Sequence, residues 1–372
     1  MKRIAALFLT LAMALSLIAC SGNSDSGDNS SGNSGPAPSQ SETLPDASSG
    51  DIQKIDSPSA DLVIGTAGAG GTWYILGSAI ANLVTKYTNI NMTASSTNGT
   101  VENMRLTGAG RLDIGMTQPP ADYDAVKGQD LFDGEAYENL RYLCGGHYSI
   151  GQIAVPADSD IKTIADLKGK RVAIGVPGSG VRHVVGNGLI QLGGVTLDDI
   201  QIISVNQDQG TEALQDGTAD AAVYSGGILV SGLLNLSQSM DVRILSIPED
   251  SIAGMEKTNP AMAAAMKYVT IPAGTYRGQT EDVLTAGFIT AFTVNKDVSD
   301  DAVYSILEAI YQHSDELEEV STSGAEYTLE EGLGKGCTIT PHPGSVKWFA
   351  DPGITLEDPL ACFGQLAAPP AL

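Results

Sequence analysis

The chain has 372 residues and a formal net charge of −24, from 44 acidic and 20 basic side chains. Nucleic-acid binding needs a positively charged surface, so this charge excludes that class of protein. The length favours two lobes over a single hydrophobic core. Acidity leaves anionic ligands possible, because backbone N–H groups and helix N-termini bind anions whatever the global charge.

The first 20 residues predict a bacterial lipoprotein signal. Met1, Lys2 and Arg3 form a basic start, and an apolar stretch continues to Ala19. That stretch is short for a membrane span, which needs about 20 apolar residues, and it is typical of a signal peptide. The small residue before Cys20 indicates cleavage there and a lipid on the cysteine. An ordinary secretory peptide with an incidental cysteine is the alternative.

Residues 21–60 favour the lipoprotein interpretation. They are Ser, Gly, Asn, Asp and Pro almost throughout. Such a segment cannot bury enough apolar surface to fold, so it is predicted to be a disordered tether. The rest of the chain would then hang from the outer face of the bacterial cell membrane, at the cell surface or in the periplasm.

From residue 61 onward, apolar runs alternate with helical patterns. "DLVIGT" predicts a buried strand, and Trp73, Leu76, Ile80 and Leu83 then recur at helical spacing. Further strands are predicted at "INMTASST", "RLDIGMT", "RVAIGV" and "IQIISV", and further helices from Thr100 to Leu106, after the glycines of "PGSG", from "GTEALQ" and over 299–320. Thr163 and Asp166 have the spacing of a capping box.

Two long extended stretches, near 143–155 and 286–296, bracket a middle block. Strand–helix alternation predicts an α/β fold with largely parallel sheets. We therefore expect two lobes joined by two crossing strands. Lobe 1 would comprise 61–148 and 288–372, and lobe 2 would comprise 149–287. The cleft between such lobes is a natural site for a small molecule.

Three glycine-rich loops, 65–74, 177–182 and 224–228, follow predicted strands, where open α/β sheets bind ligands. The first lacks the lysine of a P-loop, and Trp73 replaces the last glycine of a dinucleotide fingerprint. The folded part has no nucleophile elbow, zinc-protease motif or metal-spaced Cys/His set. The sequence thus predicts a binding protein rather than an enzyme, with no cofactor or metal. Ordinary strand–helix turns are the alternative for each loop taken alone.

The candidate ligand-binding residues come from these loops and from neighbouring segments. They offer backbone N–H groups, hydroxyls, amides and aromatic rings. The set is Gly70, Gly71, Thr72, Trp73, Tyr74, Thr97, Asn98, Gly99, Thr100, Gln118, Gly178, Ser179, Gly180, Val181, Arg182, Tyr224, Ser225 and Gly226. Tyr74 and Tyr224 would cover apolar carbons of a ligand or else belong to the core. Arg182 would pair with a second carboxylate or else lie solvated at the surface.

Three cysteines remain once Cys20 is lipidated. Cys337 and Cys362 are the nearest pair, and a disulfide between them would persist outside the cytoplasm. The sequence alone does not fix that connectivity. Cys144 lies in an apolar run and is predicted to be a buried thiol.

Five stretches in order resemble the TAXI-type solute-binding proteins of TRAP (tripartite ATP-independent periplasmic) transporters. They are "IGTAGAGGTWYILGSAIANLV", "SSTNGTVENMRLTGAGRLDIGMTQ", "DLKGKRVAIGVPGSGVRH", "ALQDGTADAAVYSGG" and "TPHPGSVKWFAD". The resemblance covers about residues 61 to 352. The chain departs from the family pattern at Thr100, at Pro119-Pro120, at Val181 and at Ser345, where serine, a polar or acidic residue, threonine and alanine respectively are usual.

The resemblance implies a type II periplasmic-binding-protein fold and delivery of a solute to TRAP membrane subunits, which an ion gradient drives. It implies a small carboxylate ligand such as glutamate or 2-oxoglutarate. We expect the chain to be a monomer. Three other functions stay open: the binding protein of an ATP-driven importer, a ligand-sensing partner of a membrane receptor, and a secreted enzyme on the same fold.

Overall fold

The computed structural model describes residues 52–69, 71–332 and 336–351, all of which belong to one compact unit. The predicted signal peptide, Cys20, most of the tether, Gly70 and Cys362 lie outside the described residues. The lipidation and the Cys337–Cys362 pairing therefore stay predictions. Every described helix falls short of the length and apolarity needed to cross a bilayer.

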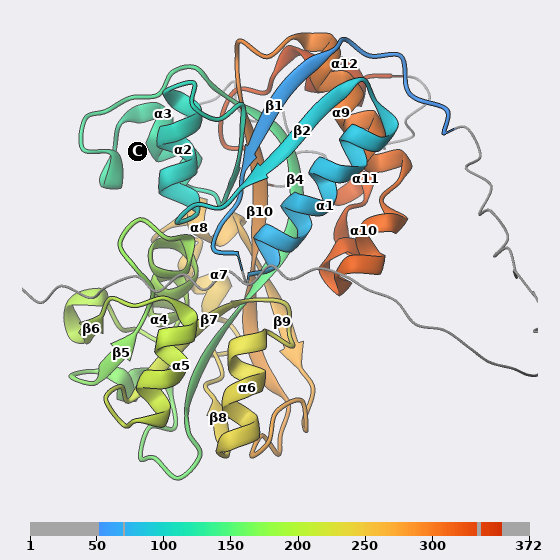
Figure 1. Cartoon of the computed structure of the whole chain (residues 1–372). Helices are drawn as coiled ribbons and strands as arrows, with labels where there is room; N and C mark the ends of the chain where they lie inside the picture. Colours follow the sequence, from blue (N-terminus) through green and yellow to red (C-terminus); the bar gives the residue numbers. More distant parts are fainter. Residues whose placement is uncertain (1–51, 70, 333–335, 352–372) are drawn as a thin grey trace, which may run out of the picture. The chain divides into compact units, whose positions relative to one another are not determined.

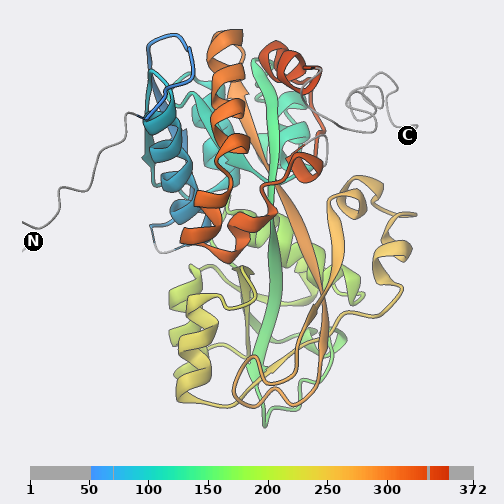
Figure 2. The same ribbon diagram turned by 90° about the vertical axis from the view of Figure 1, so that its right-hand side faces the viewer.

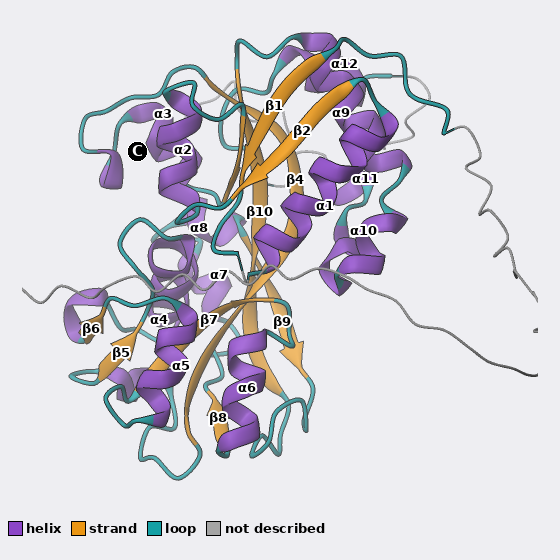
Figure 3. Cartoon of the chain, in the orientation of Figure 1, coloured by secondary structure: helices purple, strands orange, loops and turns teal. Residues whose placement is uncertain are grey.

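A ten-stranded mixed sheet has the strand order β2-β1-β3-β10-β4-β7-β5-β6, with β8 beside β4 and β9 beside β10 (Figures 1 and 3). Strand β1 pairs in parallel with β2 and β3, as β5 does with β6 and β7, whereas β4 and β10 run antiparallel to each other. The strands are β1 (Ala60–Gly65), β2 (Ile90–Ser95), β3 (Ile114–Thr117), β4 (Leu140–Pro156), β5 (Arg171–Ala173), β6 (Gln201–Ile203), β7 (Ala221–Gly226), β8 (Val242–Ile244), β9 (Met266–Ile271) and β10 (Val283–Asn295).

The helices fall into two sets, which we name with their strands. The terminal group holds β1–β3 with α1 (Thr72–Tyr87), α2 (Thr100–Gly108), α3 (Ala121–Lys127), α9 (Asp300–Gln312), α10 (Asp315–Val320), α11 (Leu329–Gly332) and α12 (Pro343–Phe349). The middle group holds β5–β9 with α4 (Asn187–Leu192), α5 (Gln207–Gln215), α6 (Ser231–Ser239), α7 (Ser251–Met255) and α8 (Pro260–Ala264). A π-helical turn (Val181–Gly186) precedes α4, and a 3-10 turn (Thr322–Glu326) follows α10.

Strands β4 and β10 run past both groups, as Figure 2 shows. Their register pairs Gly287 with Ile150 near one end and Asn295 with Leu140 at the other. Both strands are buried over almost their whole length, which fits a sequence in which Arg141 is their only Asp, Glu, Lys or Arg residue. The predicted burial of Cys144 is confirmed: it lies fully buried in β4, and burial raises the pKa of its thiol to about 12.

Each group has its own hydrophobic core. In the terminal group α1 and α9 pack on β1, β2 and β3, whereas in the middle group α4 and α6 pack around β5 and β7. The predicted α/β fold with two shared long strands is confirmed, and the architecture is that of the type II periplasmic-binding-protein fold. The predicted lobe boundaries at 148/149 and 287/288 stay predictions, and residues 352–372 of lobe 1 are not described.

One local expectation is confirmed, and two differ from the structure. The capping box of Thr163 and Asp166 is formed. The single helix predicted over 299–320 is instead α9 and α10, separated at residues 313–314. The ring of His313 at this break stacks on Tyr87, with centroids 3.4 Å apart. Strand β5 is also shorter than predicted and ends before Gly175, whose φ of +100° leaves the extended region.

Candidate functional site

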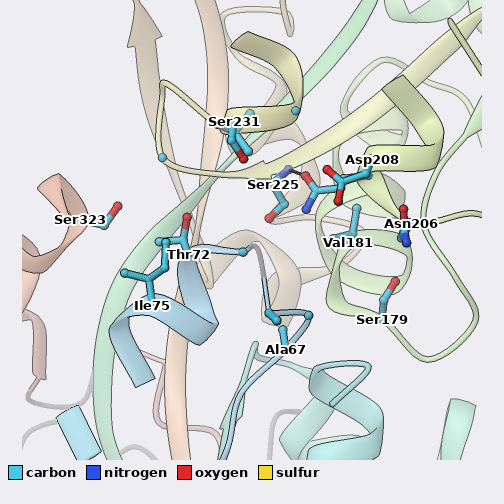
Figure 4. Close-up of a pocket in the computed structure, with 18 of the residues that line it drawn as sticks. Ala67, Thr72, Ile75, Ser179, Val181, Asn206, Asp208, Ser225, Ser231 and Ser323 are labelled. Carbon is cyan, nitrogen blue, oxygen red and sulfur yellow. Dashed lines mark hydrogen bonds between the residues drawn. The ribbon is translucent and has the colours of Figure 1, made fainter. Parts of the chain in front are cut away.

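A cavity of about 520 Å³ lies where five strands end, between the two groups (Figure 4). Loops that follow β1, β2, β5, β6 and β7 contribute to it, as expected for the carboxyl ends of strands in an open α/β sheet. The lining residues are Ala67, Gly68, Ala69, Gly71, Thr72, Ile75, Thr97, Asn98, Gly175, Val176, Ser179, Val181, Asn206, Gln207, Asp208, Ser225, Gly227, Leu229, Val230, Ser231, Gly232 and Ser321 to Ser323.

Two helices begin at the cavity wall without a side-chain cap. Helix α1 starts at Thr72 after Gly71, and α6 starts at Ser231 after Val230; neither preceding residue caps its helix with a side chain. The first N–H groups of a helix have no partner within the helix, and the helix dipole makes this end partly positive. Both ends therefore present donors suited to an anion, together with the hydroxyls of Thr72 and Ser231.

A buried amide holds the terminal-group side of the cavity in place. Asn103 donates through Nδ2 to the carbonyl oxygens of Thr66 at 2.7 Å and of Met116 at 2.8 Å. Its Oδ1 accepts from the hydroxyl of Thr97 at 2.7 Å. One side chain on α2 thus links the ends of β1 and β3 to the loop after β2.

The middle-group side is held by an amide at the start of α5. Gln207 Oε1 accepts a hydrogen bond of 2.7 Å from the backbone N–H of Ser225, at the end of β7. Asn206 caps the same helix by accepting from Gln209 N–H at 2.9 Å. Asn206 and Gln209 have the spacing of a capping box, which is a signal carried by the sequence.

The charge of the cavity wall is negative. Asp208, exposed in the first turn of α5, is the only ionisable side chain among the described lining residues. The Arg182 side chain is not part of the lining, and its Nη1 donates to Ser204 Oγ at 2.9 Å. Nearby, His183 Nε2 accepts from Gly178 N–H at 3.0 Å, and burial, assisted by the charge of Arg182, lowers the pKa of His183. The imidazole is therefore a neutral acceptor near neutral pH.

The two groups touch beside the cavity at a contact that we call the seal. The N–H of Val101 donates to the carbonyl of Gly178 at 3.1 Å. A side chain at Gly180 would have its Cβ 2.7 Å from Thr100 Oγ1 and closer still to Gln118 Oε1. Thr100 Oγ1 and Gln118 Nε2 are buried here without a hydrogen-bond partner. Only glycine fits at position 180 in this arrangement.

The structure brings seven of the predicted ligand-binding residues to the cavity wall. They are Gly71, Thr72, Thr97, Asn98, Ser179, Val181 and Ser225. The other described members lie beside the cavity or behind its wall: Trp73, Tyr74, Gly99, Thr100, Gln118, Gly178, Gly180, Arg182, Tyr224 and Gly226. Gly70 is outside the described residues. That any of these residues binds a ligand stays a prediction.

Two of the aromatic side chains predicted to contact a ligand lie in the hydrophobic cores instead. Tyr224 is fully buried in the middle-group core, where its hydroxyl lies 3.0 Å from Thr211 Oγ1. Trp73 is buried in the terminal-group core, and its Nε1 donates to Ser149 Oγ at 3.3 Å. The core alternative considered for Tyr224 is therefore the one the structure has.

Sequence reasoning missed three parts of the wall. They are residues 206–208, residues 229–232 and the segment Ser321–Ser323; Ile75 and residues 175–176, which adjoin two of the predicted loops, were missed as well (Figure 4). The segment Ser321–Ser323 follows α10 and has no glycine-loop signal of its own. It is fixed by Gly324, where any side chain would collide with the carbonyl of Leu317.

The fold and the cavity together define the class of protein. It is an α/β protein with two groups of strands and helices, and a cavity of ligand size lies at the strand ends of both groups. The chain belongs to the NMT1-like family, whose model matches residues 64–353. Among the described residues, no group of three or more His, Cys, Asp or Glu side chains is placed to hold a metal ion.

Solved structures of periplasmic binding proteins are similar in part. The alkanesulfonate-binding protein SsuA from Xanthomonas axonopodis pv. citri, bound to MOPS, is 18% identical over 74% of this chain and 85% of its own, with a TM-score of 0.42. A TctC solute-binding protein from Polaromonas is 15% identical over 73% and 88%, with a TM-score of 0.41. A binding protein of an ABC phosphonate transporter from Pseudomonas aeruginosa is 11% identical over 72% and 79%, with a TM-score of 0.42.

Proposed function

We propose that this chain is the extracytoplasmic solute-binding protein of a TAXI-type TRAP transporter and that it binds a small carboxylate such as glutamate or 2-oxoglutarate. The observation that carries this proposal is the cavity at five strand ends, with the uncapped N-termini of α1 and α6 in its wall. The motifs that resemble the TAXI family supply the transporter type.

The wall offers enough interactions for micromolar affinity without a cationic side chain. A helix N-terminus contributes about 0.3–1 kcal/mol to anion binding, and up to about 2 when partly buried. Charge-assisted hydrogen bonds from backbone N–H groups and hydroxyls add about 1.5–3 kcal/mol each. A few such contacts reach the roughly −8 kcal/mol of a micromolar dissociation constant.

The seal supports a mechanism in which the two groups close around the solute. A ligand favours closure only if it binds the closed state more tightly, which requires contacts with both groups. The wall meets this requirement, because Thr72 and Thr97 come from the terminal group and Ser179 and Ser225 from the middle group. Closure would then form the contact of Gly180 with Thr100 beside the bound ligand.

The remaining parts of the proposal concern location and partners. Cys20 would carry the lipid, residues 21–60 would tether the folded unit to the outer face of the membrane, and the closed protein would dock on the TRAP membrane subunits. The solute would be delivered unchanged, so the chain would act as a carrier rather than an enzyme, as a monomer and without a cofactor.

A thermal-shift screen of the full chain against carboxylates, amino acids and sugars tests the proposal. A ligand at about 100 times its dissociation constant stabilises the folded state by about 2.7 kcal/mol, a shift of several degrees in Tm. A carboxylate that shifts Tm and is recovered unchanged supports the proposal. A shift with a sugar alone refutes the carboxylate assignment, and chemical conversion of the bound compound refutes the carrier function.

A further inference from the structure

A second cavity of about 660 Å³ adjoins the first. Four residues line both: Gly227 and Leu229 from the loop after β7, and Thr322 and Ser323 from the turn after α10. We call this shared border the neck. An ideal Cβ on Gly227 would be 3.7 Å from Ser323 Oγ, so the missing side chain widens the neck by about one methyl group.

The two cavities differ in chemistry. The first presents hydroxyls, amides and helix N-termini, whereas the second is walled mainly by apolar and aromatic side chains, among them Tyr148, Ile150, Tyr268 and Val269. Its charged residues neutralise each other: Lys267 Nζ lies 3.9 Å from Glu326 Oε1 and 3.6 Å from the centre of the Tyr148 ring. The second cavity therefore suits an uncharged, apolar group.

Exposed apolar side chains gather at the same place. Five large apolar residues stand out as exposed among the described residues, and three of them, Ile75, Leu229 and Tyr268, line these cavities. Leu229, at the neck, is 62% exposed. Clustered exposed apolar surface next to polar groups is typical of a binding site.

The charge of the first cavity limits the ligand further. Asp208 is the only ionised side chain in its described wall, and Arg182 is outside that wall. The helix N-termini can bind a single carboxylate. A second carboxylate would be repelled by Asp208 and would find no cationic side chain in the described wall to pair with.

We propose that the ligand is a monocarboxylate with a long apolar chain, whose head binds in the first cavity and whose chain passes the neck into the second. This inference rests on the proposed carboxylate-binding function and keeps its carboxylate, but it replaces the dicarboxylates glutamate and 2-oxoglutarate with a monocarboxylate. The two cavities then form one elongated site, with its polar end in the first cavity and its apolar end in the second. Each cavity alone has the size of sites that take drug-sized ligands, about 300–1,000 Å³.

The test is calorimetric titration of the full chain with butanoate, hexanoate, octanoate, glutamate and 2-oxoglutarate. Burial of one methylene tightens binding about fourfold, so octanoate should bind at least about tenfold more tightly than butanoate. Val269→Asp places a charge in the second cavity and should remove this gain. Thr270→Asp is the matched control, since it adds the same charge one residue further along β9, on an exposed side chain outside both cavities.

Each result of these titrations supports or overturns a stated part of the proposal. A gain with chain length that V269D removes and T270D keeps supports the inference. Equal affinity for octanoate and butanoate, or tighter binding of glutamate or 2-oxoglutarate than of octanoate, overturns it and leaves the proposed function standing. If no carboxylate binds, the proposed function itself fails. If V269D does not fold, Leu229→Ser replaces it, because an exposed side chain contributes little to folding; an undiminished chain-length gain in that variant also overturns the inference.

Discussion

The seal and the neck are two contacts across the same cavity, and glycine has opposite roles in them. At the seal, the absence of a side chain on Gly180 lets the two groups touch, with Thr100 and Gln118 pressed against its backbone. At the neck, the absence of a side chain on Gly227 leaves space open beside Ser323, whose Oγ would lie 3.7 Å from a Cβ at that position. A glycine in a binding-site loop therefore has to be interpreted from what faces it, because the same residue type closes one border and opens the other.

The largest effect is expected from filling the seal. Gly180→Val places a side chain where Thr100 Oγ1 and Gln118 Oε1 already lie, so the two groups cannot meet. The affinity for the carboxylate found in the screen should fall more than about 100-fold, because closure contributes contacts from both groups. Calorimetry measures this loss.

The control for this prediction is Gly254→Ala. An added Cβ there has no neighbour within 4 Å, so affinity and Tm should stay close to those of the parent. Full affinity in G180V would show that binding does not need the seal.

The next effect concerns Asp122 in α3. Asp122 is fully buried; its Oδ1 accepts from Thr338 Oγ1 at 2.6 Å and its Oδ2 has no partner. Burial raises the pKa of Asp122 to about 6. The protonated carboxyl therefore makes its full contribution to the free energy of unfolding below the pKa of the unfolded state. This contribution is lost as the pH rises through about 6.

Asp122→Asn removes the buried charge and should stabilise the chain by about 1–3 kcal/mol above pH 7. The gain should shrink as the pH falls and vanish below about pH 4, where the parent carboxyl is neutral in both states. Urea unfolding at several pH values measures this. A gain independent of pH would contradict the ionisation of a buried Asp122 at neutral pH.

A smaller effect is expected from filling the neck. Gly227→Val narrows the passage to the second cavity, so the gain of octanoate over butanoate should fall by about tenfold while binding of butanoate stays. The same substitution type at Gly180 would weaken both ligands. Titration of both variants with both carboxylates therefore separates the two borders, and an equal loss for both ligands in G227V would show that the neck also serves the head of the ligand.

The smallest effect is expected at Arg182, which lies near the seal but outside the described wall. The half-buried Arg182 directs its guanidinium to Ser204 and does not line the cavity, so Arg182→Gln should change the affinity for butanoate and 2-oxoglutarate by less than about threefold. A loss above tenfold for 2-oxoglutarate alone would assign Arg182 to a second carboxylate and extend the site toward the seal.

The fold was predictable where local signals were strong. The long stretches of β4 and β10 carry almost no charged residues, which fits burial on both faces, and the capping box at Thr163 forms as its spacing predicts. The predicted strand ends also pointed to loops that line the cavity. Features set by distant packing were not readable: the break after α9, where His313 stacks on Tyr87, depends on residues far apart in sequence. Likewise Ser321–Ser323 lines the cavity next to Gly324, whose backbone lies so close to Leu317 that no side chain fits there.

The buried thiol of Cys144 turns the shared strand into a reporter of global opening. Only a thiolate reacts quickly with alkylating reagents, and burial keeps this one protonated and inaccessible. Closure over a ligand leaves β4 within the sheet, whereas unfolding exposes it. The rate at which Cys144 is alkylated therefore depends on the fraction of molecules in which β4, the strand that both cores share, is exposed. A ligand that stabilises the folded state lowers this fraction and so lowers the alkylation rate.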